Sequence, residues 1–150
     1  MQTTPHGAAA TDGGRGNIAL VRAFFDAFQA KDLERAMDMM SEDIVYQNVP
    51  FPPDRGKAAV RRTCQAFGYF VNEFEVQMRH IAARDGVVLT ERTDVLIGPL
   101  FYLDIQVCGT FELRDGRIAV WRDYFDLAAT TAKLLVSPIR SVIRRANMRA

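Results

Sequence analysis

Two Asp-Gly pairs, at residues 85–86 and 115–116, each separate two stretches in which apolar and polar residues alternate. Asp-Gly between such stretches is typical of a tight β-hairpin turn, because both turn positions need a positive φ. The predicted strands are 74–83, 87–97, 100–113 and 117–126, with Gly98 and Pro99 interrupting the run. The second half of the chain is therefore predicted to form an antiparallel meander of about four strands.

The first half of the chain is mainly helical by its periodicity. Apolar residues recur at helical spacing from Ile18 to Phe28, Asp32 is placed to cap a second helix ending before Asp43, and a third helix covers about 57–70. A short strand at 44–48 lies between them and ends before the prolines at 50, 52 and 53. Helices followed by a meander predict an α+β fold, in which a curved, mostly antiparallel sheet is wrapped by the N-terminal helices into a cone with a deep apolar pocket.

The chain of 150 residues has the size of one domain. Residues 1–16, rich in Gly, Ala and Thr, are predicted to be a flexible leader, and residues 17–150 a single domain that includes a helical tail interrupted at Pro138. In that tail Ile139, Val142, Ile143 and Met148 alternate with Arg140, Arg144, Arg145 and Arg149. The pattern suits a membrane-surface helix, but we expect packing over the mouth of the cone or against a second subunit in preference to membrane contact.

Composition argues against several classes of function. A formal charge of +1 gives no general basis for binding nucleic acid. Cys64 and Cys108 form neither a disulfide framework nor a CxxC pair, two histidines do not suggest a metal site, and no Gly-rich loop would cradle a phosphate. We therefore expect no metal and no cofactor. Without a membrane-spanning run or a secretory signal, the expected location is the cytoplasm.

Charged residues on two of the predicted strands are the candidates for chemistry. Strand side chains alternate between faces, so Arg92 and Asp94 share one face, and Asp123 shares another with Trp121 and Phe125. If both faces line the same interior, two aspartates share one arginine. Any of these residues alone is readily explained as structural, and the spacing does not show that the strands meet.

A shared guanidinium would divide the roles of two carboxyl groups, leaving one ionised as a base and the other protonated as an acid. Tyr46 and Asn48 share a face of the short strand and would position a water against the base. Such a site suits the addition of water to an epoxide. The predicted pocket lining, which would select an apolar substrate, is Phe28, Phe67, Val71, Leu96, Ile105, Val107, Trp121 and Phe125.

Three segments, at 46–48, 91–94 and 121–126, together resemble the signature segments of the limonene-1,2-epoxide hydrolases, a family of the NTF2-like, SnoaL-like cone fold. The resemblance runs from about residue 17 to residue 127. It implies an enzyme that acts in one step without metal or cofactor, usually as a homodimer. By residue type it makes Asp123 the base, Asp94 the acid and Arg92 the bridge between them, with Tyr46 and Asn48 holding the water.

The pocket departs from the family pattern, since Phe28 and Phe67 stand where the monoterpene enzyme carries smaller aliphatic residues. This departure favours a terpene-, cycloalkene- or lipid-like epoxide other than limonene oxide itself, and the segments around Gly98 and Cys108 resemble mycobacterial relatives suggested to take bulkier sterol-like epoxides. Two alternatives remain open: a ketosteroid isomerase or polyketide cyclase of the same cone fold, and a non-catalytic binding module.

Overall fold

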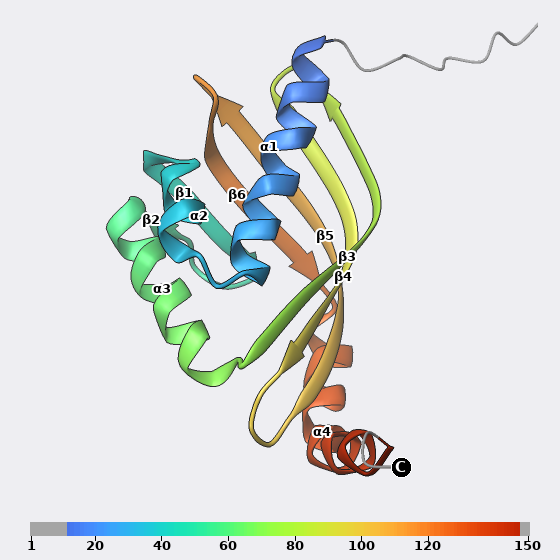
Figure 1. Ribbon diagram of the computed structural model, residues 1–150. Helices are drawn as coiled ribbons and strands as arrows, with labels where there is room; N and C mark the ends of the chain where they lie inside the picture. Colours follow the sequence, from blue (N-terminus) through green and yellow to red (C-terminus); the bar gives the residue numbers. More distant parts are fainter. Residues whose placement is uncertain (1–11, 148–150) are drawn as a thin grey trace, which may run out of the picture.

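The computed structural model describes residues 12–147, with side chains described from residue 13 to residue 137. Its elements are α1 (Asp12–Gln29), α2 (Leu33–Asp38), β1 (Met40–Val49), β2 (Asp54–Arg55), α3 (Lys57–Phe70), β3 (Glu73–Arg84), β4 (Val87–Ile97), β5 (Tyr102–Arg114), β6 (Arg117–Phe125) and α4 (Leu127–Asn147). Helices α1, α2 and α3 lie on one side of a long, strongly curved sheet (Figure 1). The predicted α+β cone is confirmed.

The sheet has six strands in the order β2-β1-β6-β5-β4-β3. Strands β3 to β6 form the predicted antiparallel meander, and both of its Asp-Gly turns have positive φ at each residue, from 51° to 79°. Strand β1 pairs parallel to β6, with Tyr46 opposite Trp121 and Asn48 opposite Asp123. This pairing extends β1 back to Met40, four residues before the strand that the local pattern predicted, because Met40 also finds a partner on β6.

Helix α1 begins at Asp12, so the predicted boundary between leader and domain at residues 16 and 17 was wrong. Three glycines in the first turns suggested a flexible segment, yet the helix continues through them and Gly14 is buried. Glycine weakens a helix by roughly 1 kcal/mol per residue, a cost that tertiary packing offsets. The leader prediction for residues 1–11 lies outside the described residues.

The other two N-terminal helices agree with the prediction. Asp32 caps α2, accepting a hydrogen bond from the backbone nitrogen of Arg35 at 3.1 Å. Helix α3 has the predicted bounds and ends at Phe70, and the next residue, Val71, is already extended. The end of α3 therefore falls between Phe67, on the helix, and Val71, beyond it.

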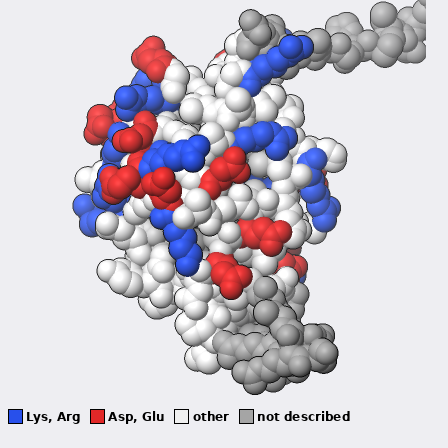
Figure 2. Space-filling view, viewed as in Figure 1, with Lys and Arg blue, Asp and Glu red and all other residues white. Residues whose placement is uncertain are grey.

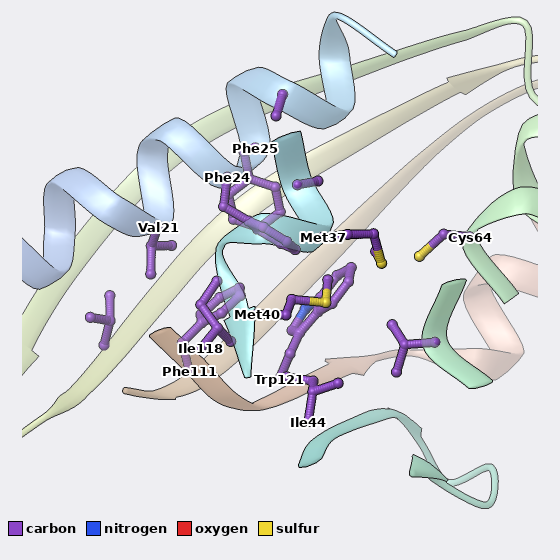
Figure 3. Close-up of a cluster of buried hydrophobic side chains, with 14 residues drawn as sticks. Val21, Phe24, Phe25, Met37, Met40, Ile44, Cys64, Phe111, Ile118 and Trp121 are labelled. Carbon is purple, nitrogen blue, oxygen red and sulfur yellow. The ribbon is translucent and has the colours of Figure 1, made fainter. Parts of the chain in front are cut away.

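Aromatic side chains form the core between α1 and the sheet. Phe24 and Phe25 on α1 pack against Phe111 on β5 and Trp121 on β6 (Figure 3). The Phe24 and Trp121 rings meet edge to face at 5.1 Å between centroids, and the Phe111 and Trp121 rings stack at 6.1 Å. Tyr46 lies against Trp121 as well, at 4.2 Å. The indole is thus held on several sides, which fixes the part of β6 that carries Asp123.

Helix α4 follows β6, packs against β5 and lies at the end of the sheet remote from the start of α1 (Figure 1). Lys133 joins it to the sheet, donating to the backbone oxygen of Asp104 at 2.9 Å and to its carboxylate at 3.0 Å. The helix continues past Pro138, where an interruption was predicted. The basic and apolar side chains of the tail lie outside the described side chains, so their role stays a prediction.

Acidic and basic side chains alternate over the face of the molecule that carries α1, α2 and α3 (Figure 2). No extended region of one sign is visible on this face, in keeping with the formal charge of +1. Among the described helices, none combines the length and the apolar character that crossing a membrane requires.

Candidate active site

Arg92 is the most deeply buried charged side chain of the site, with an exposed fraction of 1%. It lies on β4 and donates twice to Asp94 on the same face of that strand, from Nε to Oδ1 at 2.8 Å and from Nη2 to Oδ2 at 3.1 Å. Such a two-point contact fixes orientation as well as distance. The orientation of Asp94 is thereby set by its own strand neighbour.

Asp123 on β6 is bound by the same guanidinium. Nη2 of Arg92 donates to Oδ2 of Asp123 at 2.8 Å, and only 5% of Asp123 is exposed. Two carboxyl groups from different strands therefore share one cation inside the protein. Buried carboxylates without such a partner would be strongly unfavourable.

Tyr46 and Asn48 lie on β1, directly beside the strand that carries Asp123. Asn48 Nδ2 donates to the Tyr46 hydroxyl oxygen at 2.6 Å. This bond leaves the hydroxyl proton of Tyr46 and the amide oxygen of Asn48 available for a further group. Because Asn48 is opposite Asp123 in the parallel register, the two side chains emerge at the same level of the sheet.

Burial raises the pKa of both carboxyl groups, and Arg92 opposes the rise in each case. The pKa of Asp94 is raised to about 6 by burial, with Asp123 adding to the rise. Burial also raises the pKa of Asp123, against the lowering by Arg92. Burial raises the pKa of Tyr46 too, so its phenol stays protonated. One guanidinium between two such acids favours a state in which one of them keeps a proton.

The two carboxyl groups differ in their remaining hydrogen-bonding capacity. Both oxygens of Asp94 accept from Arg92, whereas Asp123 uses only Oδ2. Within the described residues, neither Oδ1 of Asp123 nor Nε1 of Trp121, two residues earlier on the same strand, has a hydrogen-bond partner of normal geometry. The indole N–H of Trp121 is nevertheless close enough to the Asp123 carboxylate to lower its pKa. A buried oxygen of this kind is an available proton acceptor.

A cavity of about 210 Å³ adjoins these groups and is mainly apolar. Seven of the eight predicted lining residues are in its wall: Phe28, Phe67, Leu96, Ile105, Val107, Trp121 and Phe125. Tyr46, Asn48, Asp94 and Asp123 also border it, while Arg92 lies behind the two carboxylates.

Val71 was wrongly placed in this wall. It borders an adjoining cavity of about 260 Å³ between α2, α3 and β3, which shares Phe28, Cys64, Phe67 and Phe74 with the first. Helical spacing put Val71 in line with Phe67, but α3 ends at Phe70 and that spacing no longer applies beyond it. Phe67 and Phe28 therefore form part of the partition between two cavities.

Four lining residues were missed: Phe25, Thr63, Cys64 and Phe74. Cys64 shares the buried stripe of α3 with Val60, and this helical spacing is the signal that could have found it. Phe25 contacts the back of the site, since its ring centroid lies 4.6 Å from Cζ of Arg92. Its helical stripe faces both the core and the cavity, which periodicity cannot separate.

The described side chains do not form a metal site. Among the described side chains, no three His, Cys, Asp or Glu gather in a way that would hold an ion. Both aspartates of the site are already engaged by Arg92. The arrangement offers an acid, a proton acceptor and groups able to hold a water.

Comparison with known proteins places the chain in a family. The family model of the limonene-1,2-epoxide hydrolase catalytic domain matches residues 15–135. The chain belongs to the limonene-1,2-epoxide hydrolase family. Its assignment from three short segments is confirmed, and with it the prediction of an enzyme of the epoxide hydrolase type.

Individual relatives agree with the family assignment. The chain is 44% identical over 110 residues to epoxide hydrolase EphG of Mycobacterium tuberculosis, covering 71% of each protein. A solved limonene-epoxide-hydrolase-like epoxide hydrolase from M. tuberculosis superposes with a TM-score of 0.80 and 36% identity, over 88% of this chain and 98% of that one. Bal32a, from a soil-derived mobile gene cassette, matches with a TM-score of 0.71 and 19% identity, over 82% and 98%, and shares the fold.

Proposed function

We propose that this limonene-1,2-epoxide hydrolase family member adds water to an apolar epoxide in one step, giving a vicinal diol by general acid and base catalysis. The single observation that carries the proposal is the Arg92 guanidinium shared by Asp94 and Asp123 at the wall of an apolar cavity. This shared guanidinium supports a state in which one carboxyl group is ionised and the other is protonated, with both within reach of one substrate.

Asp123 is the proposed base. Its Oδ1 accepts a proton from a water molecule as the water oxygen attacks an epoxide carbon. The unused acceptor capacity of Oδ1 and the position of Asn48 and Tyr46 on the adjacent strand support this role, because a donor and an acceptor beside the base would orient the water. Burial of Asp123 makes its carboxylate a stronger base than one in water.

Asp94 is the proposed acid. As the carbon–oxygen bond of the ring breaks, Asp94 gives its proton to the departing oxygen, so that no alkoxide forms. A pKa of about 6 supports the role, since a general acid works best when its pKa lies near the working pH. After the step Asp123 carries a proton taken from the water and Asp94 is ionised, because its own proton is now on the diol. Loss of the proton from Asp123 and gain of one by Asp94 restore the starting state. Water and epoxide have then become diol.

The substrate is proposed to be an apolar epoxide of terpene-, cycloalkene- or lipid-like type. Aromatic and aliphatic side chains dominate the cavity wall, and the polar groups are confined to the acid-base end. Phe28 and Phe67 border both cavities. Compact ring epoxides fit the first cavity, whereas a sterol-sized one needs these two rings to move toward the second.

A labelled-water experiment tests the reaction and its mechanism together. With enzyme in excess over a cycloalkene epoxide in H₂¹⁸O, direct attack puts ¹⁸O into the diol on the first turnover. A covalent ester would instead release first-turnover diol carrying unlabelled carboxylate oxygen. Asp123→Asn is expected to abolish diol formation, and Asp115→Asn, a matched change in an exposed turn, to leave it intact.

The same assay decides between this reaction and the rival activities. An isomerase or cyclase would rearrange a carbonyl substrate without incorporating water oxygen. A binding module would convert neither a carbonyl substrate nor an epoxide. Asp123→Asn retaining full turnover with its fold intact would exclude Asp123 as the base. No diol from a panel of small cyclic, monoterpene and sterol epoxides would exclude the proposed reaction.

A further inference from the structure

Gly109 lies in β5 at the point where Arg92 must cross from β4 to β6. The register places Gly109 opposite Thr90 on one side and opposite Asp123 on the other. Strand β5 separates the two strands that carry the ion pair, so the guanidinium reaches Asp123 over the backbone of β5. Gly109 itself is buried.

A side chain at position 109 would occupy the space that the guanidinium uses. A Cβ there would lie 2.5 Å from Nη1 of Arg92, 2.6 Å from Oγ1 of Thr90 and 2.9 Å from Oδ1 of Asp123. All three distances are far below carbon contact distances of about 3.5 Å. The φ of Gly109 is outside the left-handed region, so the position needs glycine for space rather than for backbone conformation.

Thr90 holds the guanidinium in that space. Nη1 of Arg92 donates to Oγ1 of Thr90 at 3.1 Å, and this hydroxyl in turn donates to the backbone oxygen of Gly109 at 3.4 Å. The Phe25 ring lies against the same guanidinium. Arg92 therefore has orienting contacts to Thr90 and Phe25 besides those to its two carboxylate partners.

We propose that Gly109, together with Thr90, positions Arg92 for hydration: Gly109 leaves the passage through which the guanidinium reaches Asp123, and Thr90 fixes it there. This inference rests on the proposed function. Gly109 and Thr90 are then positioning residues, which act on the reaction through Arg92 and touch neither the epoxide nor the water.

A methyl group at position 109 would push Arg92 away from Asp123 or displace the Asp123 carboxylate. The ionisable groups that interact with Asp123 are Arg92 and Asp94 on β4 and Tyr46 on β1, and Cys64 on α3 borders the same cavity. Of these only Arg92 is a cation, so its displacement removes the charge that favours ionised Asp123. The acid side of the pH-rate profile must then move to higher pH.

The experiment compares Gly109→Ala with Gly16→Ala, a control on α1 where an added Cβ meets nothing within 4 Å. We expect Gly109→Ala to lower kcat by about 100-fold, the order seen when a group of the site is misplaced by an ångström, with KM little changed. The acid limb of the pH-rate profile of this variant moves to higher pH. The ¹³C titration of the Asp123 carboxyl, whose signal is assigned by its loss in Asp123→Asn, moves in the same direction. A purely structural glycine would reduce the active fraction without moving either titration.

Thr90→Val and Thr90→Ser give a second route that keeps the passage open. Removing the hydroxyl is expected to lower kcat and shift the Asp123 titration in the same direction, and serine, which keeps the hydroxyl, is expected to restore both. Fluorescence of Trp121, the one tryptophan of the chain, reports on the fold of each variant. If Gly109→Ala does not fold, the Thr90 pair decides.

The outcomes separate the two proposals. Shifted Asp123 titrations in a protein that hydrates no epoxide would overturn the proposed function and, with it, a role in hydration, but would still show that Gly109 and Thr90 hold Arg92 against Asp123. Normal kcat and an unshifted titration in folded Gly109→Ala, or in folded Thr90→Val, would overturn the positioning role and leave hydrolysis standing.

Discussion

Arg92 and Asp123 form a buried ion pair across an intervening strand, with 2.8 Å between Nη2 and Oδ2. Most strand residues meet partners on adjacent strands or on their own. Here the length of the arginine side chain and the bare backbone of Gly109 bring β4 and β6 into direct electrostatic contact. The carboxyl groups of Asp94 and Asp123, on different strands, are thereby linked through a single planar group.

Arg92→Lys is expected to lose most of the activity while keeping the charge. An ammonium on a flexible stem has no planar fork with which to contact both oxygens of Asp94 and one of Asp123. We expect kcat to fall about 100-fold, as for other misplaced catalytic geometry. Steady-state rates of diol formation, with Trp121 fluorescence as the check on folding, measure this. Near-normal turnover would mean that Arg92 serves the fold alone.

The pH dependence of kcat/KM is expected to fall on both sides of an optimum. Asp94 donates only when protonated, and its pKa of about 6 means that rising pH through this region removes the donor and lowers the rate. Falling pH protonates Asp123 and removes the base. Rates across a pH series, in buffers of constant ionic strength, measure both limbs. A flat profile from roughly pH 5 to 9 would contradict the pair of roles.

Tyr46→Phe is expected to slow the reaction while preserving the packing of the ring against Trp121. The variant loses the acceptor for Asn48 and the free hydroxyl proton. Loss of one such bond is worth about 1.4 kcal/mol, a roughly tenfold fall in kcat. The matched control is Tyr69→Phe, whose ring is 84% exposed on α3. Equal rates in the two variants would remove Tyr46 from the mechanism.

The two cysteines are expected to differ in reactivity toward iodoacetamide. Burial raises the pKa of Cys64 to about 12, so almost none of it is the reactive thiolate near neutral pH, and Cys108 is exposed. Mass spectrometry of the folded protein should find Cys108 modified and Cys64 unmodified, and Cys108→Ser should abolish labelling. Denaturation should expose both. Labelling of Cys64 in the native protein at the rate of Cys108 would show that the cavity opens widely.

The pattern of residues predicted the individual elements well because each depends on local chemistry. Both hairpin turns required Asp-Gly at positive φ, Asp32 capped its helix, and alternation placed Arg92 and Asp94 on one face. The parallel pairing of β1 with β6 was not visible in the same way. No local signal tells which distant strand will accept Tyr46 and Asn48, and only the family resemblance joined them to Asp123.

The errors arose where local rules meet tertiary contacts. Glycines at the start of α1 suggested disorder, and Val71 was counted on a helix that had already ended. The close approach of Arg92 to Gly109 had no local signal, because it depends on an arginine from another strand. The predicted homodimer, the cytoplasmic location, and the absence of a metal or cofactor stay predictions.

The parallel contact between β1 and β6 also bears on how the protein is made. Asn48 must wait for Asp123 to be synthesised before the strands can pair. Arg92 and Asp94, by contrast, are neighbours from the start. A ribosome-bound chain that stops short of β6 therefore carries Arg92 and the proposed acid Asp94 but lacks the proposed base Asp123, and we expect it to be inert until β6 joins the sheet.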